Sequence, residues 1–132
     1  MSVEYAYDEE RKVMVTRFFG VVTDEDLRGQ AKAVAADDRI GPGVRELVDL
    51  SDIESIEAST STFKDVILSD RTHQEKLRGM RTAIVAPTSA LYGLSTMYAT
   101  LADLNESPST VRVFRTVDAA KDWLGLREPE RP

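Results

Sequence analysis

The chain has 132 residues, of which 42% are apolar and 30% charged, and its formal net charge is -6. This size and composition are typical of a single globular domain, and the acidic balance disfavours binding to nucleic-acid phosphates. The sequence contains no cysteine, which excludes disulfides, thiolate nucleophiles and thiolate metal sites. No apolar run approaches the ~20 residues of a membrane span, and the first residues lack the basic and apolar regions of a signal peptide. We therefore expect a cytoplasmic protein without a membrane span.

The first part of the chain predicts a β-hairpin followed by a helix. Residues 3–7 alternate large with small or charged side chains, and a charged turn separates them from the β-rich run 13–22. Within that run Phe18 and Phe19 are adjacent, so only one of them can face the core. Thr23 precedes three acids and predicts a helix N-cap, and the Gly-Pro-Gly sequence at 41–43 ends the helix.

The middle of the chain predicts a strand, a helix and a second strand. Residues 46–50 indicate a short strand that ends in polar residues. Residues 59–78 indicate a helix whose stretch 69–76 faces solvent, with the lone His73 on that polar surface. Residues 81–86 form a nearly continuous apolar run, which suits a strand near the centre of the sheet and covered on both faces.

The last part predicts a helix, a strand and a final helix. The third helix follows Pro87, and we expect its buried side to hold Leu91, Leu94, Met97, Tyr98, Leu101 and Leu104. Val111 and Val113 alternate with a charged residue in the last strand, and the final helix begins near Asp118. Residues 127–132 offer almost nothing to bury and are expected to form a disordered tail.

The order β-β-α-β-α-β-α-β-α predicts an α/β fold. We expect a mainly parallel five-stranded sheet with an N-terminal antiparallel hairpin and four helices packed on it. Residues 1–126 are expected to form one domain, because the sequence shows no repeat or linker.

Three short stretches in this order resemble the STAS family, named for sulfate transporters and anti-sigma-factor antagonists. They are Leu-Val-Asp-Leu-Ser at 47–51, Ala-Ile-Val-Ala at 83–86 leading to Leu-Tyr-Gly-Leu at 91–94, and Val-Phe-Arg at 113–115 followed by Ala-Ala-Lys-Asp-Trp-Leu at 119–124. The chain looks closest to small bacterial proteins described as SpoIIAA-like or STAS/SEC14-like. The resemblance implies a binding module and not an enzyme.

The resemblance also implies a phosphorylation site. Signalling members of the family carry a phosphorylated serine in an Asp-Ser-Ser-Gly-like motif, at the start of the helix that follows the strand matching 47–50. Ser59 is the best positional match here, although Ala58 replaces the first serine of the motif and Thr60 replaces the glycine. No kinase partner follows from so altered a motif.

Polar residues at two strand ends suggest a binding crevice. In open α/β sheets ligands bind beyond the carboxyl ends of the parallel strands. Two such ends supply the candidate residues, which are Asp49, Ser51, Thr88, Ser89 and Tyr92. Unpaired N–H groups at helix starts favour an anionic ligand there. Helix capping explains most of the Ser and Thr residues equally well, and Tyr92 is the residue that capping does not explain.

The sequence offers no positive argument for catalysis. It lacks a Gly-rich phosphate loop, a Gly-x-Ser-x-Gly elbow and a His-Glu-x-x-His motif, and no metal or cofactor is predicted. Two functions remain open beside a weaker one, an enzyme that uses Asp49 and Tyr92. The first is a module that binds a protein partner, with self-association as a homodimer through the hairpin edge. The second is a SEC14-like carrier of a small molecule or lipid, which needs an apolar pocket of roughly 300 Å³ or more.

Overall fold

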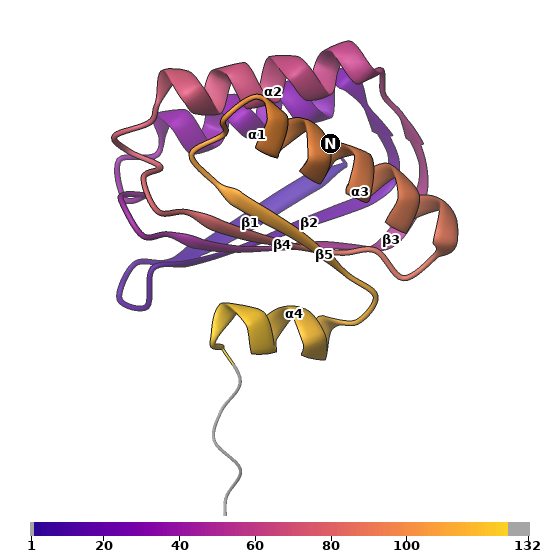
Figure 1. Cartoon of the computed structure of the whole chain (residues 1–132). Coiled ribbons are helices and arrows are strands. Elements are labelled where there is room, and N and C mark those ends of the chain that lie inside the picture. The colour runs from indigo at the N-terminus through magenta and orange to yellow at the C-terminus, as the bar shows by residue number, and fades with distance from the viewer. Residues whose placement is uncertain (1, 127–132) are drawn as a thin grey trace, which may run out of the picture.

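The computed structural model describes residues 2–126 (Figure 1), so the predicted tail at 127–132 lies outside the described residues. The nine elements follow the predicted order, and their bounds are β1 (Val3–Asp8), β2 (Val13–Thr23), α1 (Asp24–Ala36), β3 (Arg45–Glu57), α2 (Thr60–Thr72), β4 (Arg81–Val85), α3 (Ser89–Leu104), β5 (Thr110–Phe114) and α4 (Val117–Leu124). Thr23 caps α1, as the sequence predicted, and it also forms a capping box with Asp26.

The strands form one sheet in the order β1-β2-β3-β4-β5. β1 pairs antiparallel with β2, and the other neighbours pair parallel. Helices α1, α2 and α3 cover one face of this sheet, and α4 covers the other (Figure 1). The predicted α/β architecture, with an N-terminal hairpin and helices on both faces, is confirmed. The strand predicted near the centre at 81–86 is β4, an inner strand that lies between the middle strand β3 and the edge strand β5.

Side chains that alternate along the strands fill two apolar layers. Phe18, Val48 and Ile84 point to the layer beneath α1, α2 and α3, where each is less than one tenth exposed. Leu47 and Val85 point to the opposite layer, where Ala120 and Leu124 of α4 cover them. Fully burying a side chain of this size contributes about 1.5–3 kcal/mol, so both layers stabilise the sheet.

β3 is much longer than the strand predicted at 46–50. It continues to Glu57 because β2 pairs with it throughout, up to the pair Thr23 and Glu57. The pairing shifts register twice, once between Gly20 and Val21, where Gly20 has φ +63°. A residue with a Cβ adopts that conformation only with strain, so glycine suits this irregularity.

α2 ends at Thr72, and the helix predicted to reach residue 78 is wrong there. His73 caps it, and turns occupy residues 73–79. These turns bury Leu77 and Met80 against Val34 at the end of α1, an apolar contact that the helical pattern did not reveal. No helix within residues 2–126 has both the length and the apolar character needed to cross a membrane.

Candidate functional site

Asp49 and Ser51 lie together on β3. The Asp49 carboxylate accepts a hydrogen bond from the Ser51 backbone N–H at 2.9 Å, so the pair forms a local turn-like contact within the strand. Asp49 pairs in register with Arg17 of β2 and Val85 of β4. The sequence placed these two residues at the strand end, but the strand continues past them to Glu57.

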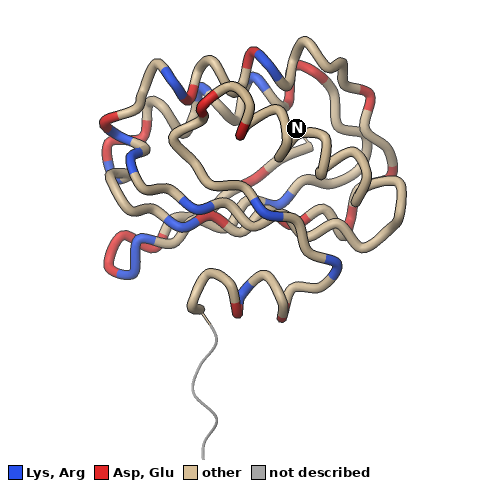
Figure 2. The backbone as a smooth tube through the Cα atoms, viewed as in Figure 1, with Lys and Arg blue, Asp and Glu red and all other residues tan. Residues whose placement is uncertain are grey.

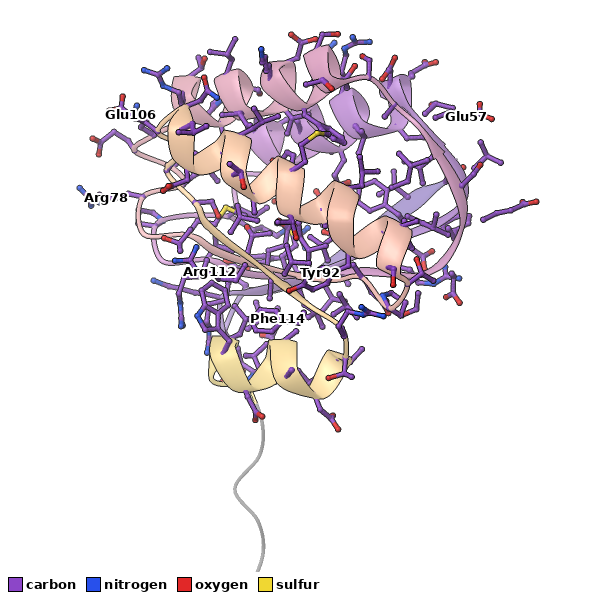
Figure 3. All side chains as sticks on the ribbon, turned by 45° about the vertical axis from the view of Figure 1, so that its right-hand side comes forward. Glu57, Arg78, Tyr92, Glu106, Arg112 and Phe114 are labelled. Carbon is purple, nitrogen blue, oxygen red and sulfur yellow. The ribbon has the colours of Figure 1, made fainter. Side chains whose placement is uncertain are left out.

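Thr88, Ser89 and Tyr92 lie at the start of α3. Thr88 is the N-cap, and its hydroxyl accepts a hydrogen bond from the Leu91 N–H at 3.2 Å. Tyr92 is 37% exposed, and the Arg115 guanidinium lies 5.5 Å from the centre of its ring. Arg115 also donates a hydrogen bond to the Pro87 carbonyl at 3.0 Å, which fixes the guanidinium over the ring. Figure 3 shows Tyr92 near the end of β5, at Phe114.

The five crevice residues form two groups. Within residues 2–126 no hydrogen bond or ion pair joins Asp49 or Ser51 to Thr88, Ser89 or Tyr92. The first group is a side-chain-to-backbone contact within β3, and the second is a helix start where the Tyr92 ring lies beside the Arg115 guanidinium. The crevice therefore stays a prediction.

Ser59 is the N-cap of α2. Its hydroxyl accepts from the Thr62 N–H at 3.4 Å and lies 2.9 Å from the Ser61 hydroxyl, while its own N–H donates to the Asp24 carboxylate at 2.9 Å. Capping explains this residue completely in the unmodified chain. The site lies next to the end of β3 at Glu57, which Figure 3 shows far from Tyr92. Ser59 and the predicted crevice are therefore separate places.

The outer face of α3 is exposed and uncharged. The segment from Ala86 to Ala102 contains no Asp, Glu, Lys or Arg, although 30% of the chain is charged. Figure 2 shows α3 almost entirely without charged residues, whereas α1 and α2 carry both signs. Met97 is 37% and Leu104 72% exposed, so the prediction that they are buried is wrong. They lie on the helix side opposite Ser95 and Ala102, which are the buried residues of α3.

A polar row crosses the core beneath α1, α2 and α3. Glu46 is 9% exposed, and its carboxyl accepts a hydrogen bond from the Thr16 hydroxyl at 2.7 Å. The Thr16 hydroxyl in turn accepts from the Gln30 amide of α1 at 3.3 Å. On the other side, Thr82 hydrogen-bonds Glu46 and lies 2.7 Å from the Ser109 hydroxyl. Burial raises the pKa of Glu46, and the bonds from Thr16 and Thr82 oppose that rise.

A cavity of about 150 Å³ adjoins this polar row. Its walls are mainly apolar side chains of β2, β3, β4 and β5 and of α1, α2 and α3, and its polar lining residues include Gln30, Glu46, Asp70, Ser95 and Tyr98. Burial first, and then the Glu46 carboxylate, raise the pKa of Asp70 to about 7. Burial also raises the pKa of Tyr98, whose ring packs edge-on against Phe63 with centroids 5.5 Å apart.

The sequence analysis missed Glu46 and Asp70 as site residues. Glu46 shares its parity with Val48 and Leu50, so strand alternation already placed it on the core face. Asp70 follows Phe63 by seven residues, which puts both on one helix face, but it stood in a stretch predicted to face solvent. That prediction is wrong for Asp70. A buried polar residue within an apolar pattern is the signal that identifies both.

The remaining titratable candidates have local explanations. His73 lies at the end of α2, and its Nδ1 is 2.9 Å from the Ser69 carbonyl. Among residues 2–126 no group of three or more His, Asp or Glu side chains is arranged to hold a metal ion. The acids at the start of α1 complement the helix dipole, and one of them, Asp24, binds the Ser59 N–H.

Comparison with known proteins places this architecture in a family. The SpoIIAA-like family model matches residues 13–125. An uncharacterised protein of the DUF3478 family from Shewanella loihica PV-4, with a SpoIIAA-like fold, is a similar solved structure: 16% sequence identity, a TM-score of 0.58, and coverage of 93% of this chain and 94% of that one. No curated protein matches. The structural likeness at this identity shows the fold alone, whereas the family model spans most of the chain, and the chain therefore belongs to the SpoIIAA-like family.

Proposed function

We propose that the chain is a non-enzymatic STAS-like module that binds a protein partner, in a bacterial regulatory context, through the outer face of α3. One observation carries the proposal: the exposed face between Ala86 and Ala102 has no charged residue in a chain that is 30% charged. The uncharged side chains of such a face gain little free energy from contact with water. Protein interfaces are depleted of Lys, Glu and Asp at their centres and enriched in Tyr, Met and Arg.

The side chains on this face fit that composition. Met97 is 37% exposed and Leu104 at the helix end is 72% exposed, while Tyr92 at the helix start, also 37% exposed, lies about 140° around the helix from Met97. Arg115 holds its guanidinium over the Tyr92 ring and is anchored to the Pro87 carbonyl at 3.0 Å. Less side-chain freedom is then lost when the guanidinium and ring meet a partner. The partner that fits is a protein whose contact surface is apolar and uncharged.

The lipid-carrier alternative is not supported by the cavity. Its volume of about 150 Å³ is half the roughly 300 Å³ that a carrier site needs. The enzyme alternative lacks geometric support as well, because no hydrogen bond in the described part of the chain joins Asp49 to Tyr92. An anionic ligand at the start of α3 and phosphorylation of Ser59 remain subordinate proposals.

Site-specific photo-crosslinking in the native cells tests this function. A benzophenone side chain replaces Met97 in one variant and Lys121, exposed on α4, in the control variant. We expect the Met97 variant to capture one protein that also binds the purified chain in solution, and the Lys121 variant to capture none of it. Equal capture at both positions, or a captured protein that does not bind the purified chain, would refute the proposal.

A further inference from the structure

The cavity beneath α1, α2 and α3 presents polar groups that lack partners. Ser95 is 5% exposed and lines the cavity, yet its hydroxyl makes no hydrogen bond within residues 2–126. Asp70 and Tyr98 also line the cavity, and neither the Asp70 carboxyl nor the Tyr98 hydroxyl has a hydrogen-bond partner in the described chain. Ser95 is buried and Asp70 and Tyr98 are partly buried, so three polar side chains without a protein partner gather around one cavity.

These oxygens are not sealed in the core. Every fully enclosed side-chain nitrogen and oxygen in residues 2–126 has a hydrogen-bond partner. The unpaired oxygens of Asp70, Ser95 and Tyr98 therefore keep accessible surface, and the cavity is the space that all three residues share. A molecule in the cavity would contact them.

The charged residues that line the cavity determine whether a cation or an anion fits in it. Glu46 from β3 and Asp70 from α2 are the acids of the lining, and no Lys or Arg of the described residues lines it. An anion would meet two carboxyl groups at close range, whereas a cation would give the Asp70 carboxyl the partner that it lacks. An ammonium group carries three N–H donors and no acceptor, which matches the three oxygen-bearing groups of Asp70, Ser95 and Tyr98.

The volume and the apolar walls of the cavity determine the size and polarity of the rest of that molecule. A protein cavity of about 150 Å³ holds one benzene molecule, and an apolar cavity of that size stays free of water. This cavity has the same volume, and its walls include Phe18, Leu50, Phe63, Ile84 and Leu94. We propose that the cavity binds a small organic amine, with a compact apolar body against these side chains and an ammonium group beside Asp70, Ser95 and Tyr98. The proposal goes beyond binding of a protein partner, because it uses the inner side of α3.

Protonation of the lining supports this assignment. The titratable residues that line the cavity are Glu46, Asp70 and Tyr98, while α1 contributes Gln30, β4 contributes Thr82, and Ser109 comes from just before β5, and none of these three titrates. The pKa of Asp70, raised to about 7 in the free chain, would fall when a cation binds beside it. Amine binding should therefore strengthen from pH 6 to pH 8, and it should release a proton at the lower pH.

Three probes that share one ring test the proposal: benzylamine, benzyl alcohol and benzoate. The ¹⁵N-labelled full chain is titrated with each probe, and amide chemical shifts are followed by NMR. We expect benzylamine to give saturable shifts around Asp70, Ser95 and Tyr98, benzyl alcohol to bind about tenfold more weakly, and benzoate to give no saturable shift. Absence of saturable shifts with benzylamine up to about 10 mM, or benzoate binding as tightly as benzylamine, would overturn the proposal.

Matched variants on α2 locate the ammonium group. Asp70→Asn should weaken benzylamine about tenfold and leave benzyl alcohol unchanged. Asp65→Asn is the control, because Asp65 is exposed on the same helix and pairs with Arg28 at 3.3 Å. Unchanged benzylamine binding by folded Asp70→Asn would contradict the assignment. If that variant does not fold, Tyr98→Phe replaces it, with weakened benzylamine binding expected and unchanged binding as the contradicting result.

Discussion

Asp70 and Glu46 are carboxyl groups placed in a layer otherwise built from apolar side chains. Burial disfavours their charged forms, and it raises the pKa of both. The folded chain therefore holds protons that the unfolded chain releases. Burying the two carboxyl groups lowers the stability of every folded molecule. A function in binding a ligand would explain why the chain keeps both.

The raised pKa of Asp70 predicts that stability falls as pH rises. The ordinary value is 3.8 and the folded value is about 7, so the folded chain binds the extra proton between these pH values. The free energy of unfolding should decrease through this window and level off above pH 7. Asp70→Asn should remove part of the slope and stabilise the chain at pH 8 by about 2 kcal/mol. Urea denaturation of both proteins at pH 5 and pH 8 measures this, and parallel pH profiles would contradict it.

Substitution of Ser59 should weaken the helix cap of α2 without preventing folding. Its hydroxyl receives the Thr62 N–H, so Ser59→Ala should cost about 1 kcal/mol in urea denaturation, and Ser59→Asp should cost less because aspartate also caps. A Ser59→Ala protein as stable as wild type would show that the cap contributes nothing.

Phosphorylation of Ser59 is a separate prediction. A phosphate there would lie among the carboxylates of Asp24 and Glu57, and the added repulsion should weaken docking of a partner on that side. Phosphopeptide mapping of chain purified from its native cells is the measurement. The prediction is contradicted if residues 57–62 are unmodified in every growth phase and if Ser59→Ala and Ser59→Asp bind partners equally. Ser59 would then serve only as a helix cap.

At the scale of elements, the sequence predicted all nine in order because strand and helix periods differ clearly and Thr23 and Gly-Pro-Gly punctuate them. The misplaced bounds have physical causes. β3 continues through a polar stretch because β2 supplies its hydrogen bonds, and α2 stops early because turns bury Leu77 and Met80. In both cases the cause lies in residues outside the strand or helix whose end was misplaced.

β4 is the element whose disruption should be most damaging. Ile84 is 7% exposed and lies between β3 and β5 in the layer beneath the helices. Ile84→Asp should prevent folding, because a charge there has no partner and the cost reaches about 4–5 kcal/mol. Circular dichroism during heating is the measurement, with exposed Arg112→Asp on β5 as the control. A soluble Ile84→Asp protein that melts cooperatively would contradict the importance of this strand.

At the scale of the whole molecule, the binding surfaces could be predicted only in part. Thr88, Ser89 and Tyr92 were identified from their place after β4, and they do lie at the start of α3. The exposure of Met97 and Leu104 depends on how α3 is rotated against the sheet, and the cavity depends on β3, α2 and α3 meeting. Such long-range arrangements are not encoded in the periodicity of any single segment.

Self-association is predicted at the hairpin end of the sheet. Phe18 is buried, and Phe19 faces the other side beneath Arg17, whose guanidinium lies 4.8 Å from the ring centre. Val15 is 42% exposed on the same face as α4, which packs on β3, β4 and β5. Light scattering should show a mass that rises above 14.7 kDa with concentration, and Val15→Glu should lower it. A mass that stays at the monomer value at every concentration would contradict the predicted homodimer.

The central claim is that the uncharged outer face of α3 binds the partner, and a charge placed on that face tests it most directly. Met97→Glu adds a carboxylate at the middle of the face, and Lys64→Glu places the same residue at an exposed position of α2. The affinity of each purified variant for the protein captured at Met97 is measured by isothermal titration calorimetry. Met97→Glu should bind about tenfold or more weakly than wild type while melting at the same temperature, and Lys64→Glu should bind as wild type does. Equal affinity of Met97→Glu and wild type would contradict the account.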